Sequence, residues 1–80
     1  MKFSTETLHE LNVLKMFDLS STQVGIKVHH DAEPELVSAT QRLFSKGLIT
    51  QNDGGYLTGL GRDAAVHTND VLTILTTAKV

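Results

Sequence analysis

The step Asp53-Gly54-Gly55 near the middle of the chain limits the possible folds more than any other feature of the sequence. It stands between two runs that favour extended structure, Leu48-Ile49-Thr50 and Tyr56-Leu57-Thr58. Glycine reaches the positive φ angles of a tight turn without steric cost, so this combination predicts a β-hairpin. Residues 48–58 are therefore not helical, and any helix of the chain lies before or after this segment.

The residues before the hairpin carry the signals of both ends of a helix over 34–46. Pro34 suits the first turn of a helix, where its missing N–H group is not needed, and Asp31 or Glu33 can cap the start. Gly47 suits the left-handed conformation that ends many helices. We therefore predict that this helix leads directly into the hairpin.

The predicted helix over 34–46 has two different faces. An apolar stripe contains Leu36, Ala39 and Leu43, which recur at helical spacing and indicate a face turned to the core. The opposite face is polar, from neutral to basic, and consists of Ser38, Gln41, Arg42 and Ser45. Only this outer face and the tip of the hairpin are available to a partner.

An earlier helix is predicted to begin after Ser4, whose hydroxyl suits the N-cap position. Leu8, Leu11 and Leu14 recur at helical spacing, and Phe17 closes the apolar stripe. We expect this stripe to face the core.

A short second helix is predicted over about 21–28, because Ser20-Ser21-Thr22-Gln23 fits a capping box. Gly25 lies inside it and costs a helix roughly 1 kcal/mol relative to alanine. Two interpretations of this glycine stand side by side. It allows close approach of a neighbouring helix, or it is simply tolerated in a helix that its neighbours hold in place.

A C-terminal helical extension is predicted over 59–80, with Thr58 as its N-cap. Thr68-Asn69-Asp70 could instead cap a separate last helix, and the β-branched run 71–77 also permits a strand. One face of a continuous helix would carry Ala64, Val71, Leu75 and Ala78, with Ala65 and Leu72 beside it.

The 80 residues fit a single domain over 1–80, with no internal repeat and no linker. The absence of cysteine excludes disulfides and cysteine-built zinc sites and fits a reducing compartment. The sequence has neither a run of ~18 apolar residues nor the apolar region of a signal peptide near its N-terminus. We therefore expect a cytoplasmic protein with no membrane partner.

The motifs around the hairpin resemble those of a known class of regulators. The run Arg42 to Thr50, then Gly55-Tyr56-Leu57-Thr58 and Gly61-Arg62, is similar to bacterial winged-helix transcriptional regulators of the multiple-antibiotic-resistance repressor type. The whole chain also resembles a family of short bacterial proteins described as DNA-binding but of unknown function. The resemblance implies a mainly α fold with a small β-hairpin, a winged helix-turn-helix with three helices, a two-stranded wing and a C-terminal helix.

The leading functional expectation is DNA binding by a transcriptional regulator, with the helix 34–46 in the major groove. Ser38, Gln41, Arg42 and Ser45 would read base edges, while Lys46 and Lys27 would contact phosphates. The alternative is that these are ordinary side chains of a solvated helix face.

The charge distribution predicts that DNA binding is weak. Residues 1–35 carry three basic and six acidic side chains, and residues 36–80 carry four basic and three acidic ones, for a net charge of −2. The hairpin tip contains Asp53 and no cation, so binding by one copy should be weak and depend steeply on salt. A protein-interaction winged helix that binds no nucleic acid is the second hypothesis.

The C-terminal segment offers a route to stronger binding through a homodimer. Val71, Leu72, Ile74 and Leu75 present apolar groups on more than one side of a helix, more than one packing face requires. The alternative is that a small domain uses all of them in its own core.

An enzyme is the weakest hypothesis, because the sequence contains no phosphate-binding glycine loop, no nucleophile elbow and no cysteine. His29, His30 and Asp31 are metal-ligand residue types, and Glu33 and His67 could join them, but adjacent histidines in a turn are more often exposed. We expect no metal site and no cofactor.

Overall fold

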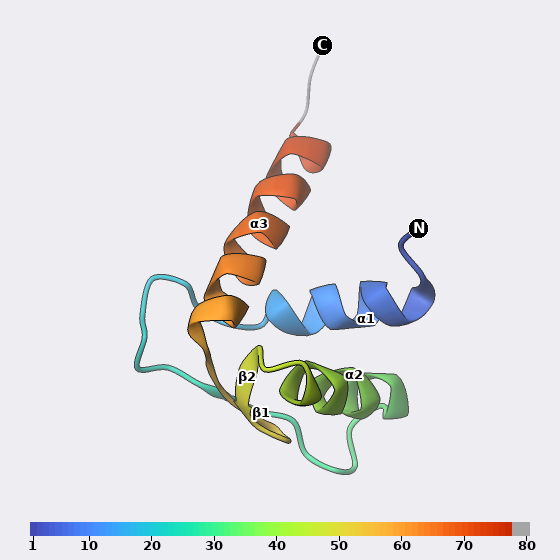
Figure 1. Cartoon of the computed structure of the whole chain (residues 1–80), viewed down its shortest axis with the longest axis vertical. Helices are drawn as coiled ribbons and strands as arrows, with labels where there is room; N and C mark the ends of the chain where they lie inside the picture. Colours follow the sequence, from blue (N-terminus) through green and yellow to red (C-terminus); the bar gives the residue numbers. More distant parts are fainter. Residues whose placement is uncertain (78–80) are drawn as a thin grey trace.

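The computed structural model describes residues 1–77 and contains three helices and one small antiparallel sheet (Figure 1). The prediction of a mainly helical chain with a small β element is confirmed in this coarse form. The elements, in chain order, are α1 (Thr5–Leu14), β1 (Ile26–Lys27), α2 (Pro34–Ser45), β2 (Ile49–Gln51), β3 (Gly54–Leu57) and α3 (Gly59–Thr76).

Three helix ends follow the predicted local chemistry, but at the start of α2 the N-cap residue Glu33 forms no capping hydrogen bond through its side chain. The Ser4 hydroxyl accepts a hydrogen bond from the Thr7 amide at the start of α1, and the Thr58 hydroxyl accepts one from the Gly61 amide at the start of α3. Gly47, with φ of 81°, follows the C-cap of α2. The end of α2 is a Schellman motif, because the Leu48 amide donates to the Leu43 carbonyl and the Gly47 amide to that of Phe44.

The predicted helix over 21–28 is wrong. The serines of this region form hydrogen bonds with residues two positions away, whereas a capping box joins residues three positions apart. Ser21 Oγ accepts from the Gln23 amide, and Asp18 Oδ1 accepts from both the amide and the hydroxyl of Ser20. Such bonds two residues apart favour turns over helix. The chain runs as a loop to β1, which replaces the predicted helix with a strand.

The hairpin is confirmed, and β1 extends it from two strands to three. The strand order is β1-β3-β2, with both pairs antiparallel. A Cβ atom added to Gly25 would lie 2.5 Å from the Gly55 carbonyl oxygen, so this glycine allows close approach of a strand. The interpretation that a neighbouring helix approaches Gly25 is therefore wrong.

The core lies where α1 and α2 pack on each other and on the hairpin. Most of the predicted stripe of α1 faces the core, because Leu14 and Phe17 are buried and Leu11 packs against them, but the buried face is turned toward Val13 and leaves Leu8 exposed. The hairpin and α3 contribute Ile49 and Ala65. The complete buried apolar cluster is Val13, Leu14, Phe17, Ala39, Leu43, Ile49 and Ala65.

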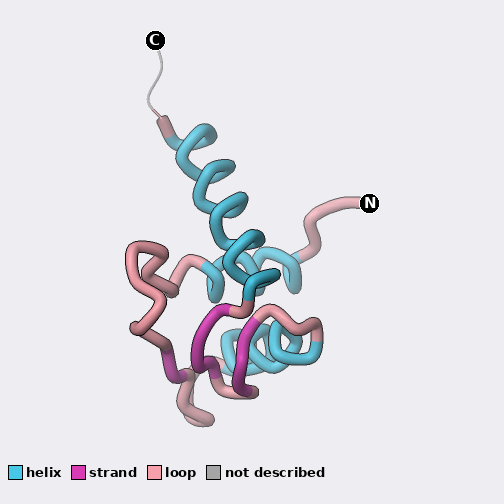
Figure 2. The backbone as a smooth tube through the Cα atoms, turned by 60° about the vertical axis from the view of Figure 1, so that its left-hand side comes forward, coloured by secondary structure: helices cyan, strands magenta, loops and turns pink. Residues whose placement is uncertain are grey.

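The C-terminal segment is one continuous helix as far as Thr76, so neither the separate last helix nor the strand occurs. The first turns of α3 pack on the rest of the domain, and its later turns extend away from it (Figures 1 and 2). Ala78, predicted on the same face, lies outside the described residues. Across residues 1–77, no helix combines the length and the apolarity that crossing a membrane requires.

Candidate nucleic-acid interface

The outer face of α2 carries three of the six residues predicted to contact DNA. Ser38, Gln41 and Ser45 are all exposed and lie three or four residues apart, which puts them on one side of the helix. The opposite side packs into the core through Ala39, Thr40 and Leu43. The rigid packing of α2 therefore presents a short, uncharged polar stripe to solvent.

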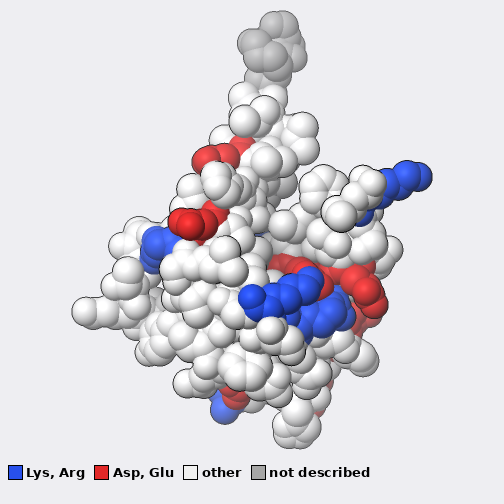
Figure 3. Space-filling model, in the orientation of Figure 1, with Lys and Arg blue, Asp and Glu red and all other residues white. Residues whose placement is uncertain are grey.

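Arg42 and Lys46 lie beside this stripe but turn toward α1. Arg42 Nε donates to Glu10 Oε2 at 2.6 Å, and Lys46 Nζ donates to Glu10 Oε1 at 2.6 Å. Arg42 also donates to the Glu6 carbonyl at 3.2 Å. Figure 3 shows basic side chains beside acidic ones where α1 and α2 meet.

The Glu10 carboxylate is stabilised in its charged form. Burial by itself would raise the pKa of Glu10, but the hydrogen bonds and charges of Lys46 and Arg42 outweigh it and lower the pKa. The side chain of Glu10 is 11% exposed, against 29% for Arg42 and 54% for Lys46. One nearly buried anion thus holds two cations that remain accessible from solvent.

Lys27 lies on a different part of the surface, on β1. Its Nζ atom forms an ion pair at 3.5 Å with Asp53 in the hairpin turn, and both side chains are largely exposed. Such an exposed pair contributes little to stability and is weakened by salt. Lys27 is therefore close to the hairpin tip, separate from Arg42 and Lys46.

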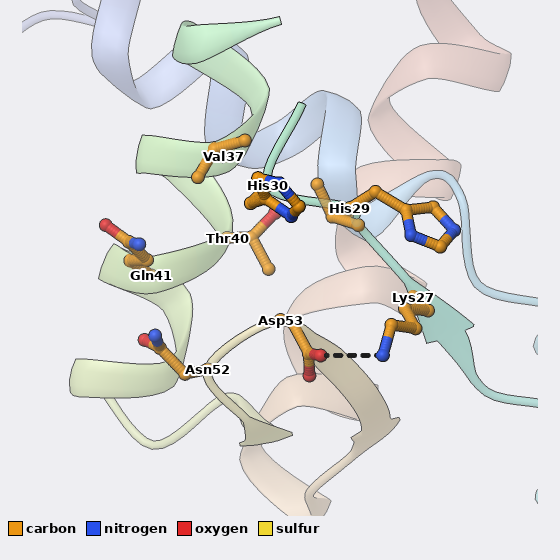
Figure 4. Close-up of a pocket in the computed structure, with 9 residues that line it drawn as sticks. Lys27, His29, His30, Val37, Thr40, Gln41, Asn52 and Asp53 are labelled. Atoms are coloured by element: carbon orange, nitrogen blue, oxygen red, sulfur yellow. Dashed lines mark ion pairs between the residues drawn. The ribbon is translucent and has the colours of Figure 1, made fainter. Parts of the chain in front are cut away.

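An open pocket of about 380 Å³ lies between α2, β1 and the hairpin turn (Figure 4). Two of the predicted residues, Lys27 and Gln41, are on its wall. The lining residues are Lys27, Val28, His29, His30, Val37, Thr40, Gln41, Asn52 and Asp53. In this depression Val37, Thr40 and Gln41 of α2 lie across from Asn52 and Asp53 of the hairpin turn.

The structure thus divides the six predicted residues into three groups. The first group is the uncharged stripe of Ser38, Gln41 and Ser45 on α2. The second is the pair Arg42 and Lys46, where α2 meets α1, and the third is Lys27 at the hairpin. Each of these three cations has a carboxylate partner. Within the described residues, no group of three histidine or acidic side chains is placed to hold a metal ion.

Sequence reasoning missed the residue that organises this surface, Glu10. The sequence pattern indicates this role, because Glu10 shares a helical face with Val13, Leu14 and Phe17, and an acidic residue in an apolar stripe requires a cationic partner.

Sequence reasoning also did not identify Arg62 as a residue that anchors a loop. Its guanidinium donates to the Leu19 carbonyl at 3.0 Å and holds the loop before β1.

The fold and this surface define a small domain of three helices and a three-stranded antiparallel sheet that presents a polar helix face next to a hairpin. The chain belongs to a family of unknown function (DUF5669), whose model matches residues 1–76. The comparison with curated proteins gives no match, and neither does the comparison with solved structures.

Proposed function

We propose that this domain binds duplex DNA as a reduced winged helix, with α2 in the major groove and the hairpin of β2 and β3 as the wing. The observation that carries the proposal is the exposed stripe of Ser38, Gln41 and Ser45 on a helix that leads directly into a hairpin. Serine and glutamine side chains suit base edges, and a groove of ~12 Å admits one helix.

A helix-turn-helix requires a second helix that supports the one in the groove. In this domain the predicted helix over 21–28 is a loop, and α1 packs directly against α2. We assign the supporting role to α1. Its carboxylate Glu10 also fixes Arg42 and Lys46 at the edge of the reading face.

The electrostatics support weak binding by a single copy. Arg42, Lys46 and Lys27 could neutralise about three phosphates, for which the affinity should fall roughly 40-fold between 50 and 200 mM salt. Each of the three is already paired with a carboxylate, so DNA must compete with Glu10 or Asp53 for them. Measurements at low salt are therefore the appropriate test.

The direct test is titration of isotope-labelled protein with a mixed-sequence duplex at low salt, followed by NMR. We expect amide shifts concentrated in residues 38–46, and we expect Gln41→Ala to weaken binding by roughly fivefold or more, equivalent to about 1 kcal/mol. Gln23→Ala, in the exposed loop before β1, is the matched control and should bind unchanged. Absence of shifts at millimolar DNA would contradict DNA binding.

A second variant tests the role of Glu10 on the same surface. Glu10→Gln removes one negative charge next to Arg42 and Lys46, so it should tighten DNA binding and steepen its dependence on salt. Tightening of at least about threefold at 50 mM salt is expected from the loss of one repulsive charge near the phosphates. Equal binding by the two proteins would mean that α2 does not face DNA.

The second candidate function is a protein-interaction domain that binds no nucleic acid. The specific observation in its favour is that the cations of the face are neutralised within the domain, by Glu10 and by Asp53. On this hypothesis neither the natural chain nor Glu10→Gln binds DNA at any salt concentration. The NMR titration therefore separates the two candidates.

A further inference from the structure

Two rows of residues run side by side along α3, and one of them contacts the rest of the domain. That contact is made by Gly61 and Ala65, which are buried, with Thr68 partly buried one turn later. The other row begins at Leu60 and recurs alternately every four and three residues. It consists of Leu60, Ala64, His67, Val71 and Ile74, and we call it the outer stripe of α3.

The spacing of the outer stripe is that of a coiled-coil seam. Ala64 is partly buried and packs against the core of its own domain, whereas Leu60, Val71 and Ile74 are all exposed, with Ile74 at 72%. More than half of each of these three side chains is open to solvent. An apolar row with this period favours packing against a second helix.

The distal turns of α3 widen this apolar surface. Leu72 and Leu75 continue the row that begins with Gly61 and Ala65, but both are exposed and lie beyond Asn69, whose side chain accepts a hydrogen bond from Lys15 at the end of α1. Leu75 is 76% exposed. The stretch from Val71 to Thr76 carries no charged side chain, so a partner segment must be apolar as well.

We infer that the outer stripe of α3 is the binding surface for α3 of a second copy of this chain, in a parallel and in-register pair. The inference stands apart from DNA binding, because it rests on α3 and uses none of the residues of the α2 face. A second copy is a partner whose helix offers the same spacing and the same uncharged apolar segment. His67 of each copy then lies at the middle of the seam.

The acidic residues of α3 favour the parallel orientation. Asp63 and Asp70 are seven residues apart and lie on the same flank of the outer stripe. In an antiparallel pair this flank would meet the same flank of the other copy and place carboxylates opposite carboxylates. In a parallel pair it meets the other flank, which carries Thr68 and Leu75, so no like charges meet.

The available area fits a dimer of modest affinity. Four exposed side chains on or beside the outer stripe, Leu60, Val71, Ile74 and Leu75, together offer on the order of 260 Å² of apolar surface per copy, if a buried Leu or Val removes about 100 Å² from water. Apolar atoms make up about 60% of an interface, so the pair would bury on the order of 1,000 Å² in total. That is the lower limit for a specific interface and the size class of weak, transient pairs, so we expect a dissociation constant of about 1–100 µM.

Sedimentation equilibrium of the full chain between about 1 µM and 1 mM tests the pairing. We expect a reversible monomer–dimer equilibrium that Ile74→Asp weakens by at least about tenfold. Thr73→Asp is the matched control, since it adds the same charge one residue away, off the outer stripe, and should leave the equilibrium unchanged. A chain that stays monomeric at 1 mM overturns the inference.

His67→Leu provides a variant with the opposite expected effect. It replaces a polar residue at the centre of the seam and should tighten the dimer by at least about threefold, because a polar residue in a coiled-coil seam lowers its stability. A variant that failed to fold would lose the reversible monomer–dimer equilibrium, so a tighter dimer that keeps this equilibrium reports on the seam. An unchanged dissociation constant for His67→Leu would show that the outer stripe is not the seam.

Single cysteines test the orientation, because the natural sequence has none. In the parallel pair, Ile74 lies opposite Ile74 of the other copy, so Ile74→Cys alone should form a disulfide-linked dimer under mild oxidation. Thr73→Cys should not crosslink. An antiparallel pair would instead require a mixture of Leu60→Cys and Ile74→Cys chains, and crosslinking only in that mixture overturns the parallel register.

Discussion

Glu10 shows how one side chain can connect the stability of this domain with its candidate surface. It lies on the α1 face that packs against α2 and accepts hydrogen bonds from both Arg42 and Lys46. A carboxylate on a side chain that is only 11% exposed would be unfavourable without such partners, since burial of an unpaired charge costs several kcal/mol. The two cations in turn are held at the edge of the α2 face.

The lowered pKa of Glu10 predicts the sign of a pH effect. A carboxyl group whose pKa is lower in the folded state than in the unfolded state contributes stability above its unfolded value, and this contribution is lost as the pH falls through the folded value. We expect Glu10→Gln to lower the free energy of unfolding by about 1–2 kcal/mol at pH 7. At pH 2–3 the difference between the variant and the natural chain should shrink toward zero.

Denaturant unfolding of both proteins at several pH values measures this difference. The exposed Asn12, on the opposite side of α1, offers a control, and Asn12→Gln should show the same pH dependence as the natural chain. A stability difference between Glu10→Gln and the natural chain that stays constant from pH 7 to pH 2 would argue against this role for Glu10.

At the scale of elements, α3 sits directly on the start of the hairpin. The Thr58 amide donates to the Leu48 carbonyl at 3.0 Å, and a Cβ atom on Gly61 would lie only 1.8 Å from the same carbonyl oxygen. The backbone of the first turn of α3 therefore packs against the backbone that leads into β2. Glycine is required at this point because any side chain would push the two elements apart.

Two glycines in the same helical turn give a matched pair of variants. Gly61→Ala should lower the free energy of unfolding by about 1–3 kcal/mol, because the added methyl group overlaps a backbone atom that cannot move freely. Gly59→Ala has nothing within 4 Å of the added Cβ and should be neutral or stabilising by up to about 1 kcal/mol. Thermal unfolding checks both, and equal effects at the two positions would contradict this packing.

At the scale of the whole molecule, the domain combines a packed body with a helix that extends beyond it (Figure 2). The Cα extents of 43 × 28 × 23 Å reflect this shape. The body contains the α1, α2 and hairpin core, whereas the distal part of α3 exposes Val71, Leu72, Ile74 and Leu75. The inferred dimer would cover this apolar surface without changing the body.

Pairing through α3 predicts that thermal stability depends on protein concentration. If only the folded chain pairs, the midpoint of unfolding should rise by a few degrees between about 5 and 500 µM, because association stabilises the folded state by mass action. Ile74→Asp should remove this dependence, and Thr73→Asp should retain it. Calorimetry at several concentrations measures the effect, and a constant midpoint for the natural chain would speak against association.

The sequence by itself determined the local boundaries of this protein. The caps at Ser4 and Thr58, the glycine end of α2 at Gly47 and the hairpin after it all depend on hydrogen bonds and backbone angles within a few residues. Such interactions are readable from the order of residues alone. The polar stripe on α2 was predictable for the same reason, since the helical period fixes which side chains share a face.

Tertiary structure decided the rest. The loop and strand in place of a helix over 21–28 depend on pairing with β3, which lies beyond α2 and β2 in the chain. The rotation of the buried face of α1 and the capture of Arg42 and Lys46 by Glu10 depend on how α1 packs on α2. Long-range contacts select among the local possibilities that the sequence leaves open, because burial and strand pairing outweigh the small differences in local propensity.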